Sequence, residues 1–225
     1  KFYIRYSNIN LAVYWTYILH KYKSLFNIWN LLFEIYLEDI GIGTPLLPHH
    51  IYYIYNNKKD NADLVDILEL IVIYCKAYKT RLNVHIYTTL YNREEWYNIY
   101  IPYKNIGYDE LYNIFKNKLK NSINNISKYK NINSFLLQYE LLYIISQIHN
   151  THIDQIWNYI LEYVIYLSNY YRLNIIALYN IYKLTYNPLT IIQCIILLTQ
   201  NINWDEHIFP NSLKEKWKFS KREFR

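Results

Sequence analysis

The sequence predicts an all-α protein built as a multi-helix bundle, and three observations lead to this fold class. Apolar residues recur at i, i+3 and i+4 along most of the chain, which is the pattern of amphipathic helices. Several of these stretches begin at cap-forming residues, as Asn187-Pro188 does before a long apolar run. With 225 residues, the chain can bury a sizeable core without disulfides or metals.

In the first half of the chain, the pattern predicts five helices. Ser7 or Asn8 caps the first. Its apolar face carries Leu11, Tyr14, Trp15, Ile18 and Leu19, and the rings of Tyr14 and Trp15 are expected to pack against the second helix. Four more are expected over residues 25–37, 44–55, 64–78 and 80–97. Thr44 and Pro45 would form the cap and first position of the third helix. Residues 82–86 also alternate at period two, so a short strand stays open there.

Ile101-Pro102 and Gly107 interrupt this pattern, and the domain boundary is placed there, which gives domains over residues 1–100 and 101–225. Beyond it, helices are expected around 111–119, 137–148, 156–164 and 188–198, with a polar, lysine-rich link over 121–133. Thr151 to Asp154 is a capping-box variant before the third of these helices. From residue 204 the chain is a polar tail whose candidate anchors are Trp204, Phe209, Trp217 and Phe219.

The net charge of +6 is uneven along the chain. Residues 1–110 hold 11 basic and 11 acidic residues, whereas residues 111–225 hold 13 basic and 7 acidic ones. Such an excess favours a polyanion such as DNA, and the alternative is a solvated helix face and terminus. The basic residues of this excess are Lys116, Lys118, Lys120, Lys128, Lys130, Lys214, Lys216, Lys218, Lys221, Arg222 and Arg225.

The tyrosines, the cysteines and the apolar runs of the chain indicate its core, its compartment and its relation to membranes. The 29 tyrosines go with abundant Asn, Ile and Lys, which is the bias of an A/T-rich genome, so they are expected in core and rim positions. A stacking platform for single-stranded nucleic acid is the alternative. Cys75 and Cys194 are too few for a disulfide framework, which favours a reducing compartment, cytoplasmic or nuclear. No apolar run reaches the ~18 residues of a membrane span, so no membrane partner is expected.

The segment from Leu37 to Pro45, LEDIGIGTP, is the most informative in the chain, because it holds two of the three glycines. Two glycines within three residues predict unusual backbone geometry or a close approach of two backbones. Glu38 and Asp39 are adjacent, and neighbours on a helix diverge by about 100°, so a shared catalytic or metal role is disfavoured. We expect a structural turn formed by Glu38, Asp39, Gly41, Gly43 and Pro45, with the carboxylates accepting N–H bonds from the helix near Thr44.

Three blocks of the first 90 residues resemble the helical region that follows the ATPase module in the RarA/MgsA family of clamp-loader-like AAA+ proteins. Residues 5–16, RYSNINLAVYWT, are similar to the family's R-G-S-D-x-x-A-A-L-Y-W-L. Residues 28–45 resemble I-A-R-R-L-x-x-x-x-S-E-D-I-G-x-A-D-P, and 77–81 resemble A-P-K-S-N. The chain departs from the family at its paired arginines, here Asn30 and Leu31, and at the residue before the proline, here Thr44.

The resemblance implies a non-catalytic, collar-like domain that self-associates or docks in a replication or recombination assembly. The chain has no G-x-x-x-x-G-K-[ST] loop, so any ATPase activity is expected in an upstream or separate AAA+ module. No cofactor is expected. Arg5, Lys79 and Arg81 are candidate contacts to DNA or a partner, and the alternative for Lys79 and Arg81 is an interaction with a helix C-terminus.

The remaining polar residues form no sequence pattern that is typical of an active site, so no enzyme is expected. His49 and His50 are expected on an amphipathic helix, and a cap between His149 and His152 disfavours a shared metal. Both cysteines are expected in the core. The second hypothesis for the whole chain is a structural subunit of an organellar or viral assembly, such as a mitochondrial ribosome. A virus with an A/T-rich genome is a plausible source of a stand-alone version of the RarA/MgsA-like helical domain.

Overall fold

The computed structural model describes residues 1–22, 25–59, 61–92, 106–127, 135–148 and 153–200, together with Ile202 and Trp204. These residues form an all-α, multi-helix fold, which confirms the predicted class. The α-helices are α1 (Phe2–Arg5), α2 (Ile9–Tyr22), α3 (Leu25–Ile35), α4 (Leu47–Lys58), α5 (Leu64–Lys76), α6 (Leu82–Asn92), α7 (Tyr108–Ser127), α8 (Phe135–Ile148), α9 (Ile153–Val164), α10 (Asn169–Thr185) and α11 (Leu189–Thr199). A π-helical turn, η1 (Tyr36–Ile40), and a 3-10 turn, η2 (Gly41–Gly43), follow α3.

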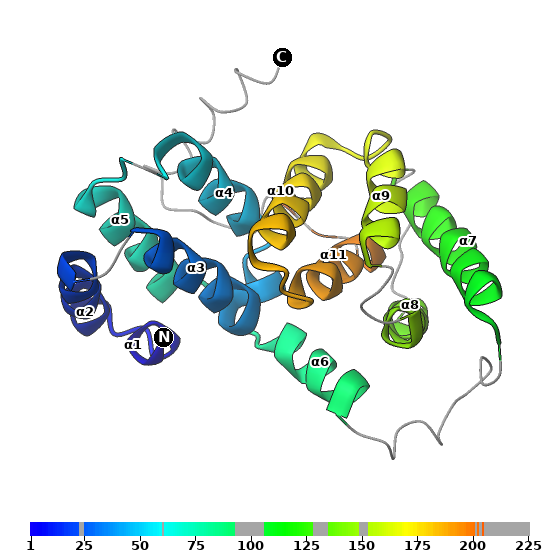
Figure 1. The fold of residues 1–225 in the computed structure, drawn as a ribbon, viewed down its shortest axis with the longest axis horizontal. Coiled ribbons are helices and arrows are strands. Elements are labelled where there is room, and N and C mark those ends of the chain that lie inside the picture. Colours follow the sequence, from blue (N-terminus) through cyan, green and yellow to red (C-terminus); the bar gives the residue numbers. More distant parts are fainter. Residues whose placement is uncertain are drawn as a thin grey trace.

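Figure 1 shows α1 to α5 on one side of the molecule and α7, α8 and α9 on the other, with α10 and α11 between them. Helix α11 is the centre of the fold, because all of its residues from Leu189 to Thr199 are buried. It packs against α6, α7, α8, α10 and the η1–η2 turn. A helix that is apolar all round belongs in a core, which explains why the longest apolar run of the sequence lies here.

The buried residues of both sequence halves join in one hydrophobic cluster. Helix α10 packs on α4, and the Asn174 side chain accepts a hydrogen bond from the His49 backbone N–H at 3.3 Å. Ile101 and Pro102 lie outside the described residues, so the division into 1–100 and 101–225 stays a prediction. The common cluster indicates that the two segments stabilise each other.

Helix α2 forms where it was expected, and Asn8 caps it by accepting a hydrogen bond from Leu11 N–H at 3.2 Å. The expected packing of its aromatic face on the next helix is wrong. Tyr14 and Trp15 are exposed, and the small residues Ala12 and Thr16 are buried instead, because α2 packs mainly on α5. Small side chains let these two helix backbones approach closely.

Several element boundaries also differ from the expectation. Helix α4 begins at Leu47 and not at Thr44-Pro45, with Pro48 in its first turn. Residues 82–86 are helical, which excludes the short strand. The expected link after 121 is helical as far as Ser127, because Ile123 and Ile126 are buried against the core. Helices α1 and α10 had not been expected from the sequence pattern.

Trp204 is the one anchor of the expected tail that the structure describes. Its ring stacks on Tyr170 at 5.6 Å and meets Tyr171 edge-on at 4.9 Å, measured between ring centroids. The other three candidate anchors, Phe209, Trp217 and Phe219, lie outside the described residues.

Candidate functional site

The turn that joins α3 to α4 is shaped by its two glycines. Gly41 has φ +52° and ψ −129°, a conformation that residues with a Cβ rarely adopt. A Cβ on Gly43 would overlap the backbone carbonyl oxygen of Tyr78. The expected unusual backbone and the expected close approach of two chain segments therefore both occur at this turn.

Asp39 lies in this turn with 0% of its surface exposed, and it is bound by two arginines. Its Oδ1 accepts a hydrogen bond from Arg5 Nε at 2.9 Å and lies 2.8 Å from Arg5 Nη2, and Arg81 Nε lies 3.6 Å from the same oxygen. The expected N–H bonds from the helix near Thr44 are not the ones found. The aspartate instead connects α1 with the segment before α6. Burying a carboxylate without a cationic partner is strongly unfavourable, so pairing with arginine takes precedence over capping a helix start.

The backbone carbonyls of the η1 turn are satisfied by the segment that carries Arg81. Thr80 donates its N–H to Asp39 O at 3.1 Å and its hydroxyl to Ile40 O at 3.0 Å. Asn83 donates its side-chain amide to Leu37 O at 2.9 Å. A helix end leaves its last carbonyls without internal partners, so these bonds fix the position of residues 80–83 against the turn.

The second carboxylate of the pair points elsewhere, as the divergence of helix neighbours predicts. Glu38 Oε2 lies 3.0 Å from Lys1 Nζ, which also pairs with Glu34. Burial lowers the pKa of Lys1 and the hydrogen bonds to Glu34 and Glu38 raise it, and the net result is a raised pKa. Lys1 is thus neutralised by its own carboxylates and is not part of the Asp39 cluster.

Lys79 completes the site from the end of α5. Its Nζ donates to the Cys75 carbonyl oxygen at 2.6 Å and to Ser7 Oγ at 3.2 Å. The bond to Cys75 is the expected interaction of a cation with a helix C-terminus. Burial lowers the pKa of Lys79, while the negative charge of Asp39 acts in the opposite direction.

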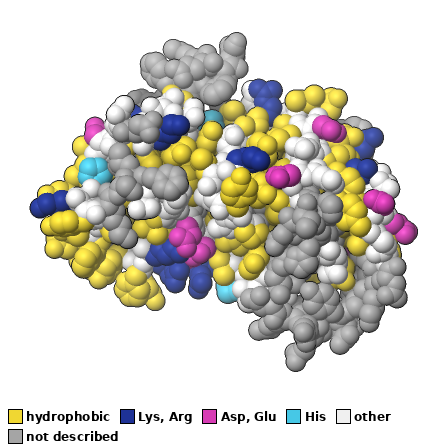
Figure 2. Space-filling view, viewed as in Figure 1, with side chains coloured by type: hydrophobic (Ala, Val, Ile, Leu, Met, Phe, Trp, Pro, Cys, Tyr) yellow, Lys and Arg dark blue, Asp and Glu magenta, His cyan; other side chains and the backbone are white. Residues whose placement is uncertain are grey.

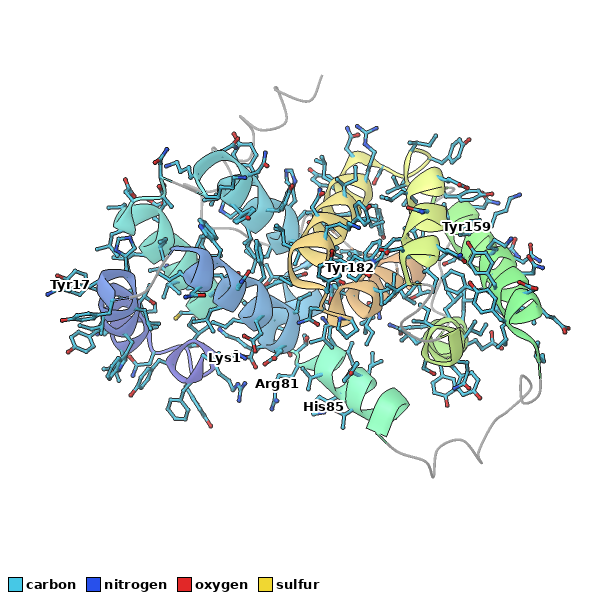
Figure 3. All side chains as sticks on the ribbon, in the orientation of Figure 1. Lys1, Tyr17, Arg81, His85, Tyr159 and Tyr182 are labelled. Carbon is cyan, nitrogen blue, oxygen red and sulfur yellow. The ribbon has the colours of Figure 1, made fainter. Side chains whose placement is uncertain are left out.

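The site therefore carries an excess of positive charge. Arg5, Lys79 and Arg81 face the single carboxylate of Asp39. Beside them, Lys1 pairs with the carboxylates of Glu34 and Glu38. Four positive and three negative side chains therefore leave one positive charge. The side chains of Arg5 and Arg81 are 35% and 43% exposed. Figure 2 shows basic side chains beside acidic ones at the lower edge of this view, next to a hydrophobic surface, and Figure 3 labels Lys1 and Arg81 in that region.

Two residues of this site have left-handed backbone geometry. Ser7 has φ +59° and Arg81 has φ +49°. For a residue that is neither Gly nor Asn, this conformation costs roughly 1 kcal/mol, and such strain gathers where the surrounding structure imposes a position. Here the bonds of Thr80 and Asn83 on either side hold Arg81 in place.

The remaining predicted basic residues are dispersed. Lys116 lies over the Tyr112 ring, with Nζ 4.7 Å from the centroid, and Lys118 pairs with Glu140 at 2.7 Å. Lys120 is exposed. Lys128, Lys130, Lys214, Lys216, Lys218, Lys221 and Arg222 lie outside the described residues, as does Arg225.

The candidate metal and nucleophile residues are buried structural groups where the structure describes them. His49 and His50 are buried on α4, and Cys75 and Cys194 are buried in the core, as expected for the cysteines. Within the described ranges no three His, Cys, Asp or Glu residues form a group able to hold a metal ion. His149 and His152 fall outside those ranges. In the part of the chain that the structure describes, no helix is both long and apolar enough to cross a membrane.

Sequence reasoning missed two sets of residues around the turn. Asn83 and Gln193 are buried behind Gly41, where an added Cβ would lie 3.0 Å and 3.1 Å from their side-chain amides. Phe2, Tyr6 and Tyr78 are exposed beside the cations. The sequence did contain one indication of the cationic cluster, which is Asp39 itself. An aspartate between Leu37 and Ile40, in an apolar stretch, requires a cationic partner.

Comparison of the chain with protein-family models, with curated proteins and with solved structures gave no match.

Proposed function

We propose that this protein is a non-catalytic helical docking domain that associates with a second copy of itself through helix α2. The observation that carries the proposal is the outward face of α2. Leu11, Tyr14, Trp15 and Tyr22 follow helical spacing and are between 39% and 72% exposed. Large apolar side chains grouped on one face of a helix are typical of a surface that another molecule covers.

A second copy fits this face because none of those four side chains carries a charge. Two such stripes meet without like-charge repulsion, and apolar residues at this spacing suit helix–helix pairing. A small cavity of about 50 Å³ lies beside the stripe, lined by Ala12, Trp15 and Leu19 of α2 and by Ile28, Leu31 and Ile35 of α3. The stripe therefore continues into an apolar depression.

The three blocks that resemble RarA/MgsA proteins support the same role. Arg5 belongs to the first block, Asp39 to the second and Arg81 to the third, and the three side chains form one charged cluster. A cluster of this kind positions α1, α3 and α6 rigidly, which suits a scaffold. We extend the proposal to a replication–recombination assembly with an AAA+ ATPase partner, and to DNA contact through the basic second half.

Light scattering coupled to size-exclusion chromatography tests the self-association. The wild-type chain is expected to show a concentration-dependent dimer mass, and Tyr14→Glu is expected to weaken association by at least about tenfold, because it puts a charge into the apolar contact. Tyr166→Glu is the matched control, since Tyr166 is exposed on the far side of the fold, in the turn after α9. A wild-type chain that stays monomeric at its highest soluble concentration would exclude the proposal.

A further inference from the structure

We propose that Arg5, Lys79 and Arg81 bind the phosphates of single-stranded nucleic acid, with the exposed rings of Phe2, Tyr6 and Tyr78 stacking on its bases. This inference rests on the proposed contact with DNA. It adds a surface in the first half of the chain, where the proposed function had placed that contact in the second half.

Arg5, Lys79 and Arg81 keep N–H donors that remain for a ligand. An arginine has five N–H donors and a lysine has three. Asp39 uses the Nε and Nη2 groups of Arg5, and the two bonds of Lys79 leave its third proton available. Arg81 makes no hydrogen bond to the described residues through its Nη groups, and its Nε points at Asp39. The site thus presents several cationic donors to solvent.

The three cations carry more charge than Asp39 neutralises, and their positions are fixed. Asp39 neutralises one of the three cations and holds two guanidinium groups at one carboxylate oxygen. An anionic oxygen placed between these groups would meet an arrangement fixed in advance, so little side-chain freedom is lost on binding. The backbone of Arg81 is also held in place, because Thr80 and Asn83 on either side of it bond to the carbonyls of the turn.

Three exposed aromatic residues lie close to these cations in the chain, namely Phe2, Tyr6 and Tyr78. Phe2, in α1, and Tyr6, directly after it, are exposed, with ring centroids 4.7 Å apart. Tyr78 is 74% exposed and directly precedes Lys79, whose amine bonds Ser7, the residue after Tyr6. Exposed aromatic rings next to cations are a usual means of binding single strands without sequence preference, because every base has a face that can stack.

Fluorescence anisotropy with a labelled oligothymidine of about 16 nucleotides tests the proposal. The full chain is expected to bind with a log–log salt slope of about −2, as three phosphate contacts on a single strand give. Tyr78→Ala leaves the ion pairs intact and is expected to weaken binding about tenfold. Arg81→Gln is expected to weaken binding similarly and to flatten the salt slope, with circular dichroism confirming the fold of each variant.

The control variant is Lys59→Gln, which removes an exposed cation that belongs to neither proposed DNA surface. It should bind like the wild type. If Lys120→Gln and Lys116→Gln weaken binding and the Tyr78 and Arg81 variants do not, the proposed site is wrong while the DNA contact of the second half stands. If the wild-type chain binds no oligothymidine at low salt, the inference is overturned, and the self-association measured by light scattering is unaffected.

Discussion

At the residue scale, His49 is an uncharged side chain in the contact between α4 and α10. Burial lowers its pKa from the usual 6.5 to about 4, because the core disfavours the imidazolium form. As the pH falls, His49 therefore takes up a proton near pH 6.5 in the unfolded chain, whereas in the folded chain it stays uncharged until about pH 4. Protonation favours the unfolded state, so the free energy of unfolding falls as the pH falls through this interval.

Denaturant unfolding at a series of pH values measures this effect. Between pH 8 and pH 5, His49 should account for a loss of about 2 kcal/mol in the free energy of unfolding. The variant His49→Gln is expected to remove that part of the pH dependence. His85→Gln is the control, because His85 is exposed on α6, and the same pH dependence in both variants would contradict the assignment.

At the element scale, the turn between α3 and α4 depends on glycine at two positions for different reasons. Gly41 needs the left-handed region, and Gly43 lies against the Tyr78 carbonyl oxygen. Gly43→Ala is expected to lower the free energy of unfolding by about 1–3 kcal/mol, since the inserted methyl group must displace backbone. Thermal or urea unfolding followed by circular dichroism gives the value.

Gly107 provides the internal comparison, because nothing lies within 4 Å of a Cβ added there. Gly107→Ala should change the free energy of unfolding by less than about 0.5 kcal/mol. Equal effects at Gly43 and Gly107 would show that the close approach to Tyr78 does not constrain the turn.

The same turn shows how far the sequence determines the structure at this scale. The glycines of 41–43 predicted a corner because backbone requirements are local and follow from residue type. The Asp39–Arg5–Arg81 cluster could not be derived in this way, since it joins residues that are 34 and 42 positions apart. Helix α2 shows a different limit of the sequence pattern. A periodic apolar stripe identifies a helix and its apolar face, but it does not say whether the protein core or a partner covers that face.

At the scale of the whole molecule, α11 joins the two sequence halves. Helix α10 was missed because its tyrosines and asparagines weaken the apolar period, although Ile175, Leu178 and Ile181 are fully buried. Once α10 and α11 are placed, helices of the first half cover one side of α11 and helices of the second half the other (Figure 1). Stability should therefore be a property of the whole chain rather than of residues 1–100 and 101–225 separately.

Hydrogen exchange followed by mass spectrometry tests this cooperativity with a change in α11. Ile195 is fully buried, so Ile195→Ala should lower the free energy of unfolding by about 2–5 kcal/mol through lost burial and the cavity left behind. Amide protection in α5 and in α8 should fall by the same amount, because one global opening exposes both. Ile165→Ala, at an exposed position, should leave both unchanged. A loss of protection in α8 with full protection kept in α5 would instead establish two independently stable domains, since α5 would then hold its structure without the central helix.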